Sequence, residues 1–159
     1  MTAEMRPAPA DAPSKGRLRL WLRILKVSRL VEAELRERLR AEFGSTLPRF
    51  DVMAALHRSE KGMKMSELSG VLKVSNGNVT GIVDRLVDEG MVERVAVEGD
   101  RRATRVRLTA AGRTRFETLA AAHEAWVDRL LGGLDRGETA EMTALLARIA
   151  HPDAVAEEI

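Results

Sequence analysis

The residues best suited to specific chemistry lie in the stretch SNGNVTGIVDRLVDEG, residues 75–90. Read as a helix, this segment has apolar residues at helical spacing that would form one buried face, made of Val79, Ile82, Val83, Leu86 and Val87. The opposite face carries amide, hydroxyl and guanidinium groups, which form directional hydrogen bonds. A polar face opposite a buried one indicates a surface that binds a partner.

Two glycines on the polar side of this helix, Gly77 and Gly81, stand one turn apart. Each costs a helix about 1 kcal/mol relative to alanine, so their presence needs a reason. A helix pared to its backbone at these positions can enter a DNA major groove, which is about 12 Å wide. The alternatives are that the glycines admit a second protein helix, or that Asn76 and Gly77 only loosen the start of the helix.

Side chains around these glycines match the chemistry of DNA. Asparagine can pair with adenine, and arginine with guanine or a phosphate, which suits Asn78 and Arg85. Asn76 and Thr80 lie nearer the flank and suit phosphates, while Ser75 can cap the helix. The predicted DNA contacts of this helix are Ser75, Asn76, Gly77, Asn78, Thr80, Gly81 and Arg85.

Two alternating, β-branched segments follow, MVERVAV and ATRVRLT, with Gly99 and Asp100 between them. They predict a β-hairpin. Arg101 and Arg102 at its tip could enter a minor groove, whose negative potential attracts arginine where the groove narrows. Asp100 would be repelled by phosphate unless it orients one of these arginines through an ion pair, and we count Asp100, Arg101 and Arg102 among the predicted DNA-binding residues.

Helices surround this region. Lys15 to Phe43 reads as one long helix ended by Gly44, and apolar residues on several of its sides favour burial against both a core and a partner subunit. Burial within a single domain is the alternative. Further helix starts are predicted at Pro48, Ser66, Thr109 and Asp135. Helix, helix-turn-helix, hairpin and two helices together predict a winged helix held between helical arms.

The charge of the chain is unevenly spread. Residues 1–115 carry 23 lysines and arginines against 15 acids, whereas residues 116–159 carry three against nine. The segment from residue 101 to 115 has six arginines and no acid, which fits a polyanionic partner or a solvated arginine-rich surface. For Arg105 and Arg107 two roles stay open: contact with DNA, or charge that protects an exposed strand edge.

The composition also excludes several classes of protein. Without cysteine, the 159-residue chain has no disulfide, thiolate zinc site or thiol redox sensor. It has no apolar run that could span a bilayer and no secretory signal, so we expect a cytoplasmic protein. Its histidines, His57, His123 and His151, fall in separate elements, and no catalytic triad or phosphate loop stands out. We therefore predict no enzyme, no metal site and no cofactor.

The stretch from Met63 to Arg113 resembles the MarR family of bacterial transcription regulators. Its most specific part is GDRRATRVRLTAAG, where Asp-Arg-Arg precedes an alternating strand, Leu-Thr and a helix with an early glycine. The resemblance extends over about residues 17–150. It implies a mainly α fold with a small β wing, in which a winged helix-turn-helix is flanked by N- and C-terminal dimerisation helices.

The expected divisions follow from this likeness. They are a disordered leader (1–14), a dimerisation helix (15–45), a DNA-binding winged helix-turn-helix (46–109), two dimerisation helices (110–151) and a tail (152–159). The likeness implies a homodimer on a palindromic operator in double-stranded DNA, with half-sites about 10–10.5 bp apart. It also implies that Asn76, Asn78, Thr80 and Arg85 lie on the recognition helix and that Arg101 or Arg102 enters the minor groove.

The resemblance also implies a mode of regulation. Such a protein represses by covering a promoter and is released when a small aromatic or anionic molecule binds between the arms and the winged helix. The stretches LPRFDVMAALHR and VSNGNVTGIVDRLV look like the branch that controls breakdown of hydroxycinnamates and other aromatic acids. That likeness implies a hydroxycinnamate or its coenzyme A thioester as effector.

Six residues are candidates for contact with this effector: Trp21, Arg23, Arg49, Phe50, Met53 and His57. They offer apolar walls and a few polar or cationic groups, as a small-molecule pocket requires. The simpler interpretation makes Trp21, Phe50 and Met53 plain core residues and His57 a surface or satisfied histidine. Three other functions stay open: a DNA-coating protein without sequence preference, a regulator that responds to a metal or another effector, and a winged helix that binds only protein.

Overall fold

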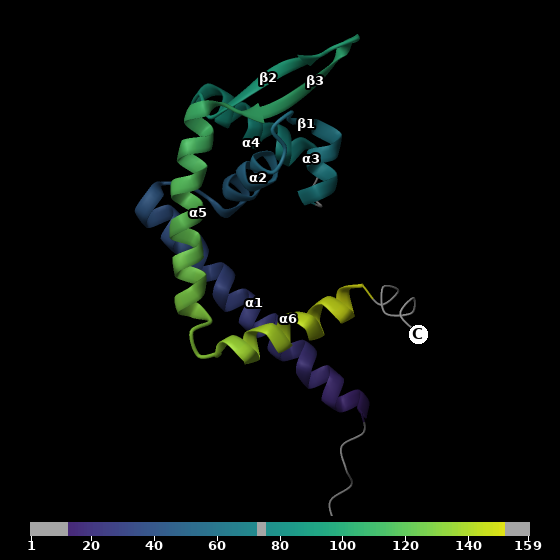
Figure 1. The fold of residues 1–159 in the computed structure, drawn as a ribbon, viewed down its shortest axis with the longest axis vertical. Helices are drawn as coiled ribbons and strands as arrows, with labels where there is room; N and C mark the ends of the chain where they lie inside the picture. Colours follow the sequence, from purple (N-terminus) through teal and green to yellow (C-terminus); the bar gives the residue numbers. More distant parts are fainter. Residues whose placement is uncertain (1–12, 73–75, 152–159) are drawn as a thin grey trace, which may run out of the picture. The chain divides into compact units, whose positions relative to one another are not determined.

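The winged helix predicted from the sequence is present in the computed structural model, which describes residues 13–72 and 76–151 (Figure 1). The predicted leader up to residue 12, the cap Ser75 and the tail 152–159 lie outside the described residues, as do the side chains of Asn76 and Gly77. The elements are α1 (Pro13–Phe43), α2 (Leu47–His57), β1 (Met63–Lys64), α3 (Met65–Leu72), α4 (Asn76–Asp88), β2 (Val92–Val97), β3 (Asp100–Leu108), α5 (Ala110–Leu130) and α6 (Arg136–Ala150). The chain forms two compact units that divide between Phe116 and Glu117.

Helix α1 differs in character between its two halves. Its C-terminal half is tied by ion pairs within the helix, Arg38 to Glu34 at 2.7 Å and Arg40 to Glu37 at 2.5 Å. The hydrogen bond from Arg40 also lowers the pKa of the Glu37 carboxyl. The part of the helix before Val31 instead exposes large apolar side chains at Leu18, Leu20, Trp21, Leu22, Val27 and Leu30. The helix starts at Pro13, two residues earlier than predicted, and ends as predicted at Gly44.

The core of the winged helix is built from the inner faces of its helices and its sheet. The side chain of Thr46 caps α2 by accepting a hydrogen bond from the amide of Arg49, and Pro48 lies in the first turn, as predicted. The predicted inner face of α4 is confirmed at its centre, where the side chains of Val79 and Val83 have no exposed surface. The other fully or nearly fully buried core residues are Val52, Met53, Leu56, Leu68, Leu86, Val92 and Val106.

The sheet has one strand more than the predicted hairpin. Strands β2 and β3 pair antiparallel, and β1 pairs with the outer side of β3, so the order is β1-β3-β2 (Figure 1). Only Met63 and Lys64 form β1, opposite Val106 and Arg105. A strand of two residues shows no alternation in the sequence, so no local pattern could have revealed it.

The start of α3 also differs from the prediction. We expected Ser66 to cap it, but the helix begins at Met65, and the carboxylate of Glu67 accepts a hydrogen bond from the Lys64 amide at 2.8 Å. A carboxylate in the first turn satisfies a free amide just as a capping serine does, and it also interacts favourably with the helix dipole.

The second unit contains the rest of α5 and all of α6. Asp135 and Glu138 form the predicted capping box, with both reciprocal hydrogen bonds at 2.9 Å. No residue of α6 is buried, and its apolar side chains at Met142, Leu145, Leu146 and Ile149 are exposed. A helix with a large exposed apolar face is typical of a surface that is covered in an assembly.

No helix in the described residues is long and apolar enough to cross a membrane.

Candidate nucleic-acid interface

The outer face of α4 is open to solvent. Asn78, Thr80, Gly81 and Arg85 are all exposed, while the buried valines hold the opposite face against the core. A Cβ built on Gly81 would meet no atom within 4 Å in the described chain. Packing within the described chain therefore gives no reason for a glycine at position 81.

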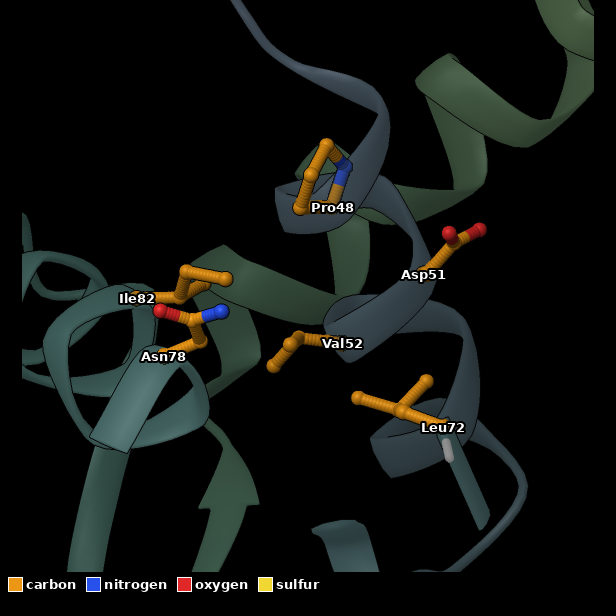
Figure 2. A pocket seen from close by; sticks show the side chains of 6 residues that line it. All are labelled: Pro48, Asp51, Val52, Leu72, Asn78 and Ile82. Atoms are coloured by element: carbon orange, nitrogen blue, oxygen red, sulfur yellow. The ribbon is translucent and has the colours of Figure 1, made fainter. Parts of the chain in front are cut away.

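Asn78 lies at one border of this face. Together with Ile82 it lines a pocket of about 310 Å³, and both side chains point toward the start of α2 in Figure 2. Pro48, Asp51, Val52 and Leu72 form the rest of the lining. The carboxamide of Asn78 is thus presented from the flank of the helix that faces α2, one turn before Ile82.

Acidic and basic residues on α4 have different surroundings. Asp84 forms an ion pair with Arg94 of β2 at 2.5 Å, which ties the helix to the hairpin and offsets the carboxylate charge. Arg85 is exposed and has no ion pair among the described residues. Arg85 is therefore the cation that this helix offers to an outside anion or base.

The hairpin ends in a tight turn at Glu98 and Gly99, where Gly99 has a φ of 86°. The Asp100 carboxylate accepts a hydrogen bond from the Arg102 main-chain amide at 3.0 Å, and within residues 13–72 and 76–151 it forms no ion pair. The Asp100 carboxylate therefore holds the backbone of the tip, and its place among the predicted DNA contacts stays a prediction. Arg101 and Arg102 are exposed at this tip.

Arg105 and Arg107, whose roles the sequence leaves open, differ in their surroundings. Arg107 donates to the Glu93 carboxylate at 2.6 Å, and these residues face each other across β2 and β3. Arg105 instead reaches out of the hairpin and donates to the Gly62 carbonyl at 3.0 Å. Both side chains thus have partners in the protein.

The candidate effector residues fall into three environments. Trp21 and Arg23 are exposed on α1, whereas Phe50 and Met53 are buried in the core. Arg49 forms an ion pair with Glu89, just beyond the end of α4.

An aromatic cluster joins two of the predicted elements. The rings of His57 and Phe50 lie 4.8 Å and 5.5 Å from the ring of Phe116, which is buried near the start of α5. Phe116 was not predicted, and its only signal in the sequence is an aromatic residue in the second turn of the helix after the wing.

No group of three histidine or acidic residues in the described part of the chain could hold a metal ion.

Comparison with known proteins agrees with this geometry. The MarR family model matches residues 45–104, which run from just before α2 into β3. A MarR family transcriptional regulator from Silicibacter pomeroyi is 36% identical, its alignment covers 90% of this chain and 99% of that one, and the structures superpose with a TM-score of 0.75. The chain belongs to the MarR family.

Two further relatives extend the comparison to DNA and to transcription. A mutant of MarR from E. coli was solved in complex with operator DNA and is 26% identical to this chain. The alignment covers 87% of this chain and 99% of that one, and the TM-score is 0.72. The transcriptional activatory protein BadR of Rhodopseudomonas palustris is 34% identical over 113 residues, which are 70% of this chain and 64% of BadR. MarR family membership makes this chain a transcription regulator and not an enzyme, and it confirms the predicted winged-helix fold.

Proposed function

We propose that this MarR family protein is a homodimeric regulator that binds a palindromic operator in a sequence-specific way. The observation that carries the proposal is the outer face of α4, where Gly81 leaves the backbone bare between the exposed side chains of Asn78 and Arg85. A helix of this shape fits a major groove, and amide and guanidinium groups can read base edges there. The similar E. coli protein bound to operator DNA supports this use of the fold.

The wing would add contacts on either side of the sequence that α4 reads. Arg101 and Arg102 are exposed at its tip, and the Asp100 carboxylate holds the backbone of Arg102. Arginine is attracted to narrow minor grooves, where the negative potential is strongest. We therefore assign α4 to the major groove and the wing tip to the adjacent minor groove.

The exposed apolar faces of α1 and α6 support a homodimer. Large apolar side chains such as Trp21 and Leu145 are about half exposed in the single chain, at 53% and 44%. Soluble proteins rarely leave several such residues uncovered on neighbouring turns of a helix. Analytical ultracentrifugation tests this point, because a mass of one chain at micromolar concentration would contradict the proposal.

We further propose that the protein represses transcription and is released by a hydroxycinnamate or its coenzyme A thioester. Candidate contacts are Trp21, Arg23, Arg49, Phe50, Met53 and His57. In this proposal a planar ring would pack beside the aromatic cluster around Phe116, and a carboxylate would compete with Glu89 for Arg49. Since BadR is named an activatory protein, transcription from the bound promoter, with and without the regulator, tests the direction of the effect.

The decisive experiment is fluorescence anisotropy of the protein on the duplex upstream of its own gene, beside a scrambled duplex of equal length. Tight binding to the native duplex alone supports a specific regulator, and loss on adding p-coumarate or p-coumaroyl-CoA supports the effector class. Equal affinity for both duplexes, governed by salt, would favour a DNA-coating protein. Absence of binding to either duplex would favour a protein partner.

The wing tip should contribute affinity to every duplex, with sequence choice limited to A·T over G·C pairs in the flanks. Replacing Arg101 and Arg102 together by alanine is expected to weaken binding to all duplexes. The magnitude of the slope of log K against log salt should fall by about two, one for each cation that no longer neutralises DNA. A salt series of anisotropy titrations measures this slope. Arg107→Ala is the matched control, because its side chain is occupied by Glu93; an equal change in this variant would contradict the role of the tip.

A further inference from the structure

The strand pairing that joins the wing to the segment before α3 is short. Strand β1 pairs with β3 through two residues only, Met63 with Val106 and Lys64 with Arg105. Beyond Arg105, toward the tip, β2 is the one strand that pairs with β3 in the described part of the chain, and this pairing shifts register between Ala96 and Val97. The part of the hairpin beyond Arg105 can therefore tilt. Arg105 is the last residue of β3, toward the tip, that pairs with β1.

The side chain of Arg105 leaves the hairpin at this point and joins two other segments. It donates to the main-chain carbonyl of Gly62 at 3.0 Å, and its guanidinium lies 3.7 Å from the carboxylate of Glu67 in α3. The Gly62 carbonyl also accepts the hydroxyl hydrogen of Ser59, and the Glu67 carboxylate accepts the Lys64 amide. One guanidinium thus links β3 to the turn after α2 and to the first turn of α3.

The surroundings leave little freedom in this linkage. Gly62 is buried with a φ of 80°, and a Cβ there would lie 2.5 Å from the carbonyl oxygen of Val106. The Arg105 side chain is one-third exposed, at 33%, so water screens its contacts only partly. Hydrogen bonds from a charged donor are shorter and stronger than those between neutral groups, and a planar guanidinium also fixes direction.

We infer that Arg105 is a positioning residue of the wing. It keeps the tip arginines, Arg101 and Arg102, in a position to enter the minor groove while α4 lies in the major groove. Arg102 lies three residues farther along β3, about 10 Å away at the rise of a strand. A rotation of about 20° at Arg105 would therefore displace Arg102 by about 3–4 Å, which is more than half the width of a minor groove, about 6 Å. This role rests on the proposed binding of operator DNA.

The test is in vitro selection of bound duplexes from a randomised library, followed by sequencing, for the whole protein and its variants. The wild-type protein should enrich a two-fold symmetric core sequence flanked by A·T pairs, since A-tracts have narrow minor grooves. In Arg105→Gln the core should persist, while the ratio of A·T to G·C in the flanks falls by about two- to thirtyfold, the range typical of coupling through a contact network. Arg105→Lys should restore part of this ratio, because lysine can still donate to the Gly62 carbonyl.

Two further variants separate positioning from general stability. Arg107→Gln removes an arginine two residues along the same strand, whose partner Glu93 belongs to the hairpin itself, and should keep the flank preference. Glu67→Gln keeps a hydrogen-bond acceptor for Lys64 but removes the charge near Arg105, and should lower the preference in the same direction as Arg105→Gln. Melting temperatures of all variants are measured in parallel.

The outcomes distinguish the inference from the proposed function. An unchanged flank ratio in Arg105→Gln, or an equal loss in Arg107→Gln, would overturn the role of Arg105. A wild-type protein that enriches a core but no A·T flank would overturn it as well. A wild-type protein that enriches no sequence at all would overturn the proposed function itself.

Discussion

Alanine in place of Gly112 is expected to destabilise the protein by about 3 kcal/mol or more, at the upper end of what overpacking costs. A Cβ at this position would lie 1.8 Å from the carbonyl oxygen of Met91, and main-chain atoms cannot rotate away as a side chain can. Urea unfolding followed by circular dichroism measures the change in free energy.

The reason for this close approach is a compact junction between the wing and α5. The Thr109 hydroxyl donates to the Gly90 carbonyl at 2.7 Å and accepts from the Gly112 amide at 3.0 Å, and the Thr109 amide donates to Met91 at 3.0 Å. The first turn of α5 is therefore locked against the segment that links α4 to β2. Pushing this turn outward would break several of these hydrogen bonds together.

Gly81→Ala is the matched control for Gly112→Ala. It lies in a helix as well, but its new methyl group would meet no atom within 4 Å. Because alanine favours a helix over glycine, this variant should gain about 1 kcal/mol. Equal stability of the two variants would show that the contact of Gly112 with Met91 relaxes at little cost.

Loss of base discrimination is the second large expected effect, and it concerns Asn78 and Arg85. Replacing either residue by alanine should reduce the preference for the operator over singly substituted duplexes by about 1–3 kcal/mol at the base pair concerned, if the side chain forms a bidentate pair with a base there. Both side chains are exposed, so we expect little change in the free energy of unfolding. Competition anisotropy with each substituted duplex measures the preference.

The control for these variants is Arg58→Ala, which removes an exposed arginine just beyond the C-terminal end of α2. It should leave the preference among duplexes unchanged. Uniformly weaker binding of Arg85→Ala to every duplex would contradict a base contact and assign this residue to a phosphate. An unchanged preference in both α4 variants would refute the proposed reading face.

Features that depend on neighbouring residues in the chain could be predicted from the sequence. The buried face of α4 follows from apolar spacing, and Val79 and Val83 are indeed at its centre. The cap that Thr109 forms on α5, by accepting from the Gly112 amide, and the capping box of Asp135 with Glu138 were also predicted. Helical periodicity and capping act over three or four residues, so the local sequence is sufficient to specify them.

The sequence alone determined the order of helices, the hairpin, the exposed polar face of α4 and the likeness to one family of regulators. Tertiary structure alone decided which charged groups stay available for a partner. Arg105 meets Gly62 across 43 residues, and Arg49 meets Glu89 across 40. Such pairs form only when the fold brings distant segments together, because the strength of an ion pair or hydrogen bond depends on distance and direction in space. The same arginine-rich strand therefore contains Arg102 at the open tip and Arg105 bound to the protein.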